Sequence, residues 1–193
     1  MIYFNSDYTE GAHESILNAL VRTNLEQTPG YGTDDYCREA ASRVRALCGN
    51  TALDVHFLVG GTQTNATVIS AALRGHQGVI SADTGHIHVH ETGAVEATGH
   101  KVLALPHQNG KITAEQVKHV WQVHHEDDSA EHCVEPKMVY ISQPTEFGTL
   151  YSKEELKALY EVCRACGMYL FIDGARLGYG LAAADSTLDF ASL

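Results

Sequence analysis

The segment 170–176 reads Leu-Phe-Ile-Asp-Gly-Ala-Arg, so an apolar run ends abruptly in a carboxylate, Asp173, with Arg176 three residues further on. In open α/β sheets, ligands bind at the carboxyl ends of the strands. A carboxylate held at such a place can pair with the cationic ring nitrogen of a bound cofactor. An ordinary strand end with a solvated turn would give the same short pattern. Other motifs are needed to choose between these two interpretations.

A second motif, Gly60-Gly61-Thr62, lies between a short apolar segment and a helical pattern. Glycine lets the backbone approach a ligand closely, and free amides at a helix N-terminus bind anions. The motif lacks the lysine of a P-loop and the spacing of a dinucleotide fingerprint, which argues against a nucleoside triphosphate site. A phosphate site and a plain strand-to-helix turn capped by Thr62 both fit it.

Three histidines, His86, His88 and His90, alternate along a third segment. On a strand their side chains would share one face and could bind a metal ion. On a helix they would diverge, and the helical pattern of residues 93–97 favours this second arrangement. The helix would bring only His86 to the strand-end crevice, where its imidazole could stack on an aromatic cofactor.

Composition places the chain among globular proteins. It has 193 residues, 44% of them hydrophobic, which suits one domain or one domain plus part of another. The net charge of −11 argues against non-specific binding to nucleic acid or to an anionic membrane. No apolar stretch approaches the roughly 20 residues of a membrane span, and the N-terminus lacks a signal-peptide pattern.

The five cysteines make an odd number, so we expect free thiols and a cytoplasmic protein. Cys163 and Cys166 lie in a helical pattern, which favours packing over zinc or redox chemistry.

Helical and strand patterns alternate along the chain. Helices are expected over residues 13–25, 34–47, 61–73, 86–97, 113–126 and 154–166. Strands are expected over residues 55–59, 78–81, 102–105, 138–142 and 169–172. This order predicts an α/β fold, a three-layer α/β/α sandwich with a mostly parallel sheet.

We expect residues 1–25 to form an N-terminal segment and helix, and residues 26–193 to form one large domain. An apolar run begins at Leu188 and stops with the chain at Leu193, an unusual end for an α/β domain. We therefore expect the sequence to be part of a longer protein.

In order and spacing, the motifs resemble those of the L-threonine aldolases, in the aromatic amino acid β-eliminating lyase/threonine aldolase family of pyridoxal phosphate (PLP) enzymes. The resemblance covers essentially the whole chain. It rests on Ser6-Asp7, Tyr31-Gly32-x-Asp34, Gly60-Gly61-Thr62-Gln63-Thr64-Asn65, His86-x-x-x-x-Glu91-x-Gly93-Ala94 and Asp173-Gly174-Ala175-Arg176. The resemblance implies the large domain of a fold type I PLP enzyme, cleavage of L-threonine or L-allo-threonine to glycine and acetaldehyde, and a homodimer or homotetramer.

The resemblance also implies a role for each candidate residue. The residues implied to bind the cofactor are Gly60, Gly61, Thr62, His86, Gln143, Asp173 and Arg176. Among these, the glycine–threonine turn would hold the phosphate and His86 would stack on the ring. Asp173 would pair with the ring nitrogen, and Arg176 would lie near the phenolic oxygen.

Three further residues are implied to meet the substrate. Ser6 would bind its carboxylate, and Tyr31 would line the pocket from a neighbouring subunit. His132 would lie near the substrate hydroxyl, so the implied catalytic set is His86, Asp173 and His132.

The sequence departs from the family pattern in three places. Asn5 replaces the arginine usual before Ser-Asp, and residues 142–146 replace the usual E-N-T-H-N, which leaves the specificity open. All six lysines precede Asp173, whereas the Schiff-base lysine of the family follows it, so we expect these 193 residues alone to be inactive. The alternatives are another PLP-dependent lyase acting by β-elimination, an aminotransferase, a histidine-rich metal-binding protein, and an inactive fragment.

Overall fold

The computed structural model describes residues 6–193. Backbone contacts divide the chain into two units that meet between Arg43 and Val44. The first unit contains α1 (Glu14–Thr23) and the start of α2 (Asp35–Leu47). The Asp34 carboxylate accepts the amide of Cys37 at 2.9 Å, and this bond lowers the pKa of Asp34. Asp34 therefore caps the N-terminus of α2.

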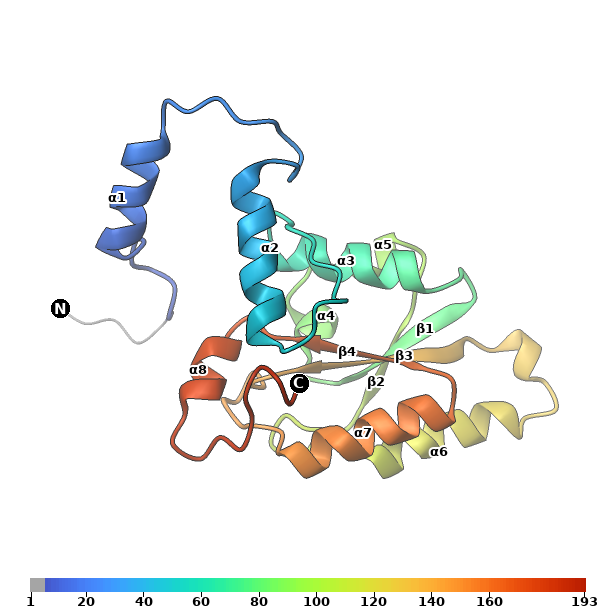
Figure 1. Cartoon of the computed structure of the whole chain (residues 1–193). Coiled ribbons are helices and arrows are strands. Elements are labelled where there is room, and N and C mark those ends of the chain that lie inside the picture. The colour runs from blue at the N-terminus through green and yellow to red at the C-terminus, as the bar shows by residue number, and fades with distance from the viewer. Residues whose placement is uncertain (1–5) are drawn as a thin grey trace. The chain divides into compact units, whose positions relative to one another are not determined.

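The second unit is built on a four-stranded sheet of order β2-β1-β3-β4 (Figure 1). The strands are β1 (Gln77–Ala82), β2 (Val102–Leu105), β3 (Glu135–Ser142) and β4 (Tyr169–Asp173). All three strand pairs are parallel. Every residue of β1 is buried, as expected of a central strand covered on both faces.

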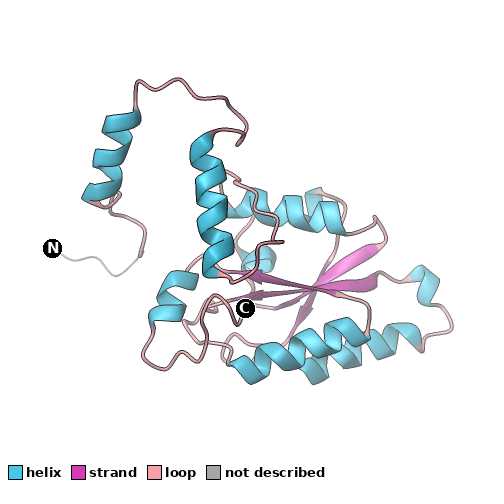
Figure 2. Ribbon diagram, viewed as in Figure 1, coloured by secondary structure: helices cyan, strands magenta, loops and turns pink. Residues whose placement is uncertain are grey.

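Helices cover both faces of this sheet (Figure 2). The helices are α3 (Gly61–Ala72), α4 (His86–Val89) and α5 (Ala94–Ala97) on one face, and α6 (Ala114–His125) and α7 (Lys153–Ala165) on the other. Successive strand residues alternate between the two cores: Val79 packs on the α3 side and Ile80 on the α7 side. The second unit is thus the predicted α/β/α sandwich, with its sheet parallel throughout.

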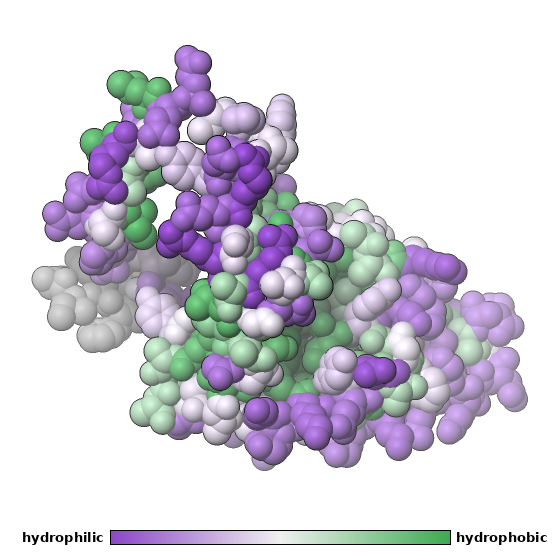
Figure 3. Space-filling view, in the orientation of Figure 1, coloured by the Kyte–Doolittle hydropathy of each residue, from purple (hydrophilic) through white to green (hydrophobic). Residues whose placement is uncertain are grey.

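Edge strand β4 is covered less completely than β1. Its apolar residues Leu170, Phe171 and Ile172 are only half-buried. Figure 3 shows apolar side chains gathered over the sheet, whereas the outer surface of the α6–α7 layer is largely polar.

A capping box begins α7. The Ser152 hydroxyl accepts the amide of Glu155, and the Glu155 carboxylate accepts the amide of Ser152 at 2.7 Å. Further along α7, Cys163 is buried in the core, and burial raises its pKa to about 12. The thiol is therefore protonated at neutral pH, which agrees with a packing role and disfavours metal binding.

Two expectations about the elements were wrong, and two short elements were not expected. Residues 55–59, expected as a strand, form a loop outside the sheet, in which Val59 is 93% exposed. The helix expected over residues 86–97 is broken into α4 and α5, because Thr92 and Gly93 adopt left-handed backbone angles between them. Short α8 (Leu177–Ala182) and the 3₁₀ turn η1 (Ala130–His132) were not anticipated. No helix within residues 6–193 is long and apolar enough to cross a membrane.

Candidate functional site

Asp173 is the last residue of β4 and pairs with Ser142, the last residue of β3, so it lies at the carboxyl edge of the sheet. Its Oδ1 accepts the Ala175 amide at 3.1 Å. Its Oδ2 accepts two donors, the Asn65 amide at 3.1 Å and the Tyr140 hydroxyl at 2.7 Å. Hydrogen bonds to an ionised acceptor are stronger than neutral ones. The half-buried carboxylate is therefore held in one orientation.

Tyr140 supports Asp173 from inside the sheet. The side chain lies in the core on the α3 side and packs edge-on against Phe171, with ring centroids 5.5 Å apart. Burial, and then the charge of Asp173, raise the pKa of the Tyr140 phenol well above its ordinary value. The phenol therefore stays protonated and remains a donor to Asp173.

Asn65 joins Asp173 to a second carboxylate. It is buried in α3, and its amide nitrogen also donates to Glu91 Oε1 at 2.6 Å. An ionised carboxylate only accepts hydrogen bonds, so the nitrogen of the Asn65 amide must face both partners. One NH₂ group thus bridges Asp173 and Glu91.

His86 begins α4 after the short loop, residues 83–85, that follows β1. A Cβ at Gly85 would lie 2.1 Å from the Ser81 hydroxyl oxygen, so only glycine allows the loop to pass this close to the strand end. The His86 Nδ1 lies 2.8 Å from Glu91 Oε1, and its main-chain amide donates to Glu146 at 3.0 Å. The imidazole is 44% exposed, whereas the Glu91 side chain is fully buried.

These contacts form one hydrogen-bonded set at the carboxyl edge, which we call the Asp173 network. Its members are His86, Glu91, Asn65, Asp173 and Tyr140. It contains two of the predicted site residues, His86 and Asp173, and three that sequence reasoning left without a role.

The predicted phosphate turn lies next to this network. Gly60 is extended, α3 begins at Gly61, and the amides of Gly61, Thr62 and Gln63 make no hydrogen bond with any residue of the 6–193 range. A Cβ at Gly60 or Gly61 would touch nothing within 4 Å, so this helix end is open. Asn65 follows Gly61 by one helical turn, about 6 Å. The free amides therefore lie near the side of Asp173 that Asn65 contacts.

This donor set fits PLP. The free amides at the start of the 12-residue helix α3 suit a phosphate dianion, and the oriented Asp173 carboxylate suits a protonated ring nitrogen. Both groups belong to the 44–193 unit and reach the same edge of the sheet.

The sequence profile of the beta-eliminating lyases matches residues 4–187. The chain belongs to the beta-eliminating lyase family. It is 32% identical over 181 residues to a low specificity L-threonine aldolase of Pseudomonas sp. (strain NCIMB 10558), with 93% of this chain and 51% of that enzyme covered.

Solved structures agree with this membership. The threonine aldolase of Leishmania major superposes with a TM-score of 0.92 at 45% identity, covering 97% of this chain and 54% of that one. A PLP-bound C-S lyase of Staphylococcus hominis superposes with a TM-score of 0.60 at 18% identity, over 85% of this chain and 42% of that one, which supports the fold type I architecture alone. The chain spans about half the length of the relatives that it matches.

Gln143 and Arg176, two residues expected to bind the cofactor, lie in different surroundings. Gln143 is buried, and its amide both donates to the Tyr151 carbonyl at 3.1 Å and accepts the Tyr151 amide at 2.9 Å. The Gln143 side chain therefore holds the loop after β3, and its expected contact with a cofactor stays a prediction. Arg176 is exposed at the start of α8, three residues after Asp173.

His132 does not join the Asp173 network within this chain. It is exposed in η1, ahead of β3, whereas Asp173 lies level with the far end of that eight-residue strand. At about 3.3 Å per residue, the strand separates the two edges by roughly 23 Å. His132 therefore lies far from the Asp173 network of its own chain, and its role beside the substrate stays a prediction.

The remaining expectations concern substrate and metal. Ser6 and Tyr31 belong to the 1–43 unit, and their roles stay predictions. Asn5 lies outside the described residues. His88 and His90 are exposed, and no three His, Cys, Asp or Glu side chains converge on a metal-sized site between residues 6 and 193.

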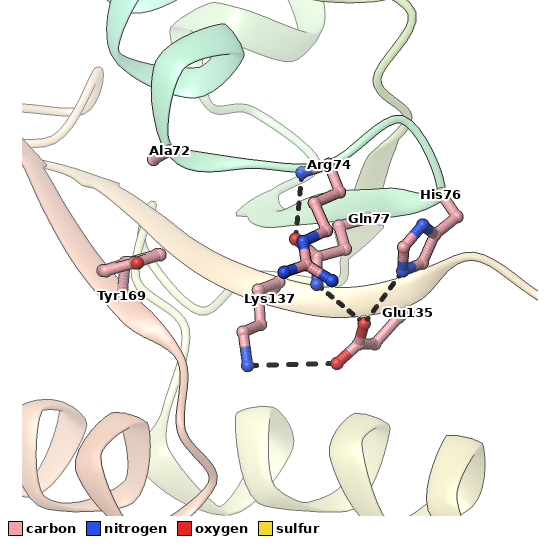
Figure 4. A pocket seen from close by; sticks show the side chains of 7 residues that line it. All are labelled: Ala72, Arg74, His76, Gln77, Glu135, Lys137 and Tyr169. Atoms are coloured by element: carbon pink, nitrogen blue, oxygen red, sulfur yellow. Dashed lines mark hydrogen bonds and ion pairs between the residues drawn. The ribbon is translucent and has the colours of Figure 1, made fainter.

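A cavity of about 400 Å³ lies at the amino edge of the same sheet (Figure 4). Its lining residues are Ala72, Arg74, His76, Gln77, Glu135, Lys137 and Tyr169. Three of these begin strands β1, β3 and β4, so the cavity opens at the edge away from Asp173. None of the family motifs contributes to it.

Proposed function

We propose that this protein is a PLP-dependent carbon–carbon lyase that cleaves L-threonine or L-allo-threonine to glycine and acetaldehyde in the cytoplasm. The observation that carries the proposal is the pairing of an open helix N-terminus with an oriented carboxylate at one edge of the sheet. Similarity to threonine aldolases over nearly the whole chain supports the same reaction.

The residues of the chain would divide the work of holding the cofactor. The amides of Gly61 and Thr62 would bind its phosphate, and Asp173 would keep a proton on its ring nitrogen. When bound, PLP supplies an electron sink for the negative charge that develops at the substrate Cα. The hydrogen bonds from Asn65 and Tyr140 leave Asp173 no need to reorient during the reaction.

His86 would cover one face of the cofactor ring. Its backbone is fixed by the bond to Glu146 and its side chain by Glu91, so the imidazole is presented without a large loss of entropy on binding. A ring held over the cofactor would also exclude water from that face.

The reaction products test this function. The intact protein is incubated with PLP and each of the two threonine diastereomers, and the products are analysed. We expect acetaldehyde and glycine in equal amounts. Ammonia with a keto acid would instead indicate β-elimination, and a keto acid without free ammonia would indicate amino transfer. A protein that binds no PLP at all would contradict the proposal.

We propose further that the active protein is a homodimer or homotetramer whose sites are completed by Tyr31 of a neighbouring subunit. The support is the family resemblance of the Tyr31 motif. Mixing Tyr31→Ala with Asp173→Ala protein provides the test, because each variant alone lacks one part of every site. Recovery of activity on subunit exchange is expected, and no recovery despite exchange would contradict shared sites.

A further inference from the structure

Glu91 is a carboxylate in a place where stability alone would favour an apolar residue. Its side chain is fully buried, and its Oε2 has no hydrogen-bond partner in the described part of the chain. Burying an ionised group is costly unless it is paired, and replacing buried ion pairs by apolar residues is often neutral or stabilising. Glu91 makes two hydrogen bonds, to His86 and to Asn65, and these partners therefore indicate its role.

The bond to Glu91 determines which nitrogen of His86 carries the proton. If Glu91 is a carboxylate without a proton, its Oε1 can only accept, and the Nδ1 at 2.8 Å is then the donor. In a neutral imidazole, the other nitrogen is then bare, because the hydrogen bond at one nitrogen sets the tautomer. The Nε2 of His86 has no hydrogen-bond partner among residues 6–193, so it is available to a ligand.

Asn65 connects this histidine–carboxylate pair to Asp173. Its two amide hydrogens go to two different carboxylates, at 2.6 Å and 3.1 Å. Both carboxylates thus share one donor group, and neither can turn without losing it. The orientation of His86 is in this way coupled to the orientation of Asp173.

We propose that Glu91 and Asn65 are positioning residues: Glu91 holds His86 in the tautomer with the proton on Nδ1, and Asn65 links that pair to Asp173. This inference rests on the proposed function, in which His86 and Asp173 meet the cofactor. It adds that the ring edge of His86 carries a hydrogen-bond acceptor at Nε2, in addition to the ring face that would cover the cofactor. The ligand group facing it must therefore be a donor, such as a substrate hydroxyl.

The tautomer of His86 tests the proposal directly, in protein without PLP. Long-range proton–nitrogen correlation spectra of ¹⁵N-histidine-labelled protein distinguish a protonated from a bare ring nitrogen, and a His86→Gln spectrum assigns the signal. At mildly alkaline pH we expect a protonated Nδ1 and a bare Nε2. A wild-type His86 with its proton on Nε2 would overturn the proposal.

Two substitutions at Glu91 separate positioning from folding. In Glu91→Leu we expect the proton of His86 to move to Nε2 or to exchange between the nitrogens. In Glu91→Gln the amide oxygen can still accept from Nδ1, so the wild-type tautomer should return. Glu96→Leu is the matched control, since the Glu96 side chain is exposed in neighbouring α5 and makes no hydrogen bond with a described residue. We expect its His86 signals to be those of the wild type.

The outcomes distinguish this inference from the function on which it rests. An unchanged tautomer in folded Glu91→Leu would remove the role of Glu91 even if PLP binds normally. Failure of PLP to bind, with the expected tautomers, would instead remove the proposed function. If Glu91→Leu does not fold, the wild-type and Glu91→Gln spectra still decide, because a proton on Nε2 in either contradicts the proposal.

Discussion

The two edges of one sheet carry polar clusters that are built differently. At the amino edge, Glu135 accepts one short hydrogen bond, from the Gln77 amide at 2.8 Å, but its ion-pair distances are long, 3.6 Å to His76 and 4.0 Å to Lys137, beside an open cavity of about 400 Å³. At the carboxyl edge, the contacts of the Asp173 network measure 2.6 to 3.1 Å, and Glu91 is fully buried. Loose, solvated ion pairs contribute little, whereas a buried polar network is costly unless nearly every member is bonded. The comparison teaches that the tightly bonded cluster, and not the open cavity at the amino edge, has the organisation expected of the proposed site.

Asp173→Asn, at the carboxyl edge, is expected to have the largest effect, and the effect is on turnover. A neutral amide cannot stabilise a protonated ring nitrogen as a carboxylate does, so turnover should fall on the order of 10²-fold or more. Steady-state kinetics of the intact protein measure the loss. Glu135→Gln at the amino edge is the control and should leave turnover unchanged, and equal effects of the two substitutions would abolish the distinction between the edges.

Asn65→Leu should have the next largest effect. Glu91 and Asp173 would both lose a buried donor, which should lower the free energy of unfolding by about 1–3 kcal/mol. PLP affinity should fall by about tenfold through the loss of orientation at Asp173. Denaturant unfolding and PLP titration measure the two quantities. Thr67→Leu, at an exposed position two residues further along α3, should change neither. An Asn65 variant with wild-type stability and affinity would contradict the network.

Tyr140→Phe should have a smaller effect, on the pH dependence of the free energy of unfolding. The pKa of Tyr140 is raised in the folded protein, whereas in the unfolded chain a tyrosine ionises near pH 10. Above about pH 10 the unfolded chain releases a proton that the folded protein keeps, so the free energy of unfolding should fall as the pH rises. Tyr140→Phe cannot ionise, and its stability should decline less steeply over this range. Unfolding curves at pH 8 to 11 compare the slopes, and identical slopes would show that the phenol is not held protonated.

Lys137→Ala should produce the smallest effect. Removing one partner of a partly exposed ion pair typically changes stability by about 0–1 kcal/mol. Thermal or denaturant unfolding should therefore detect little change, and the His86 tautomer should be unaffected. A loss above about 2 kcal/mol would mean that the amino-edge cluster is as tightly organised as the carboxyl-edge one.

The sequence predicts the sandwich and its edge residues because both depend on local patterns. Apolar runs bounded by turns place β1 to β4, and a residue that ends such a run, such as Asp173, must lie at the carboxyl edge. The same reasoning fails for residues 55–59, because an apolar run shows that a segment avoids water without showing that it has a strand partner.

The partners of Asp173 could not be predicted in the same way. Asn65 contacts it across 108 positions of sequence and Tyr140 across 33, and no periodicity reports such pairing. Asn65 and Glu91 do occur within the motifs, but their shared bond spans 26 positions and appears only once α3 and α4 pack on the same face. The chemical type of each residue was visible in the sequence, whereas the connections among them required the fold.

A crystal structure of the protein grown with PLP tests the central claim most directly, because both edges of the sheet offer groups that an anion could use. We expect the phosphate at the amides of Gly61 and Thr62, and the ring nitrogen within hydrogen-bond distance of an Asp173 carboxylate oxygen, roughly 2.7–2.9 Å. PLP bound instead in the amino-edge cavity between Arg74 and Lys137, with the carboxyl edge empty, would contradict the account.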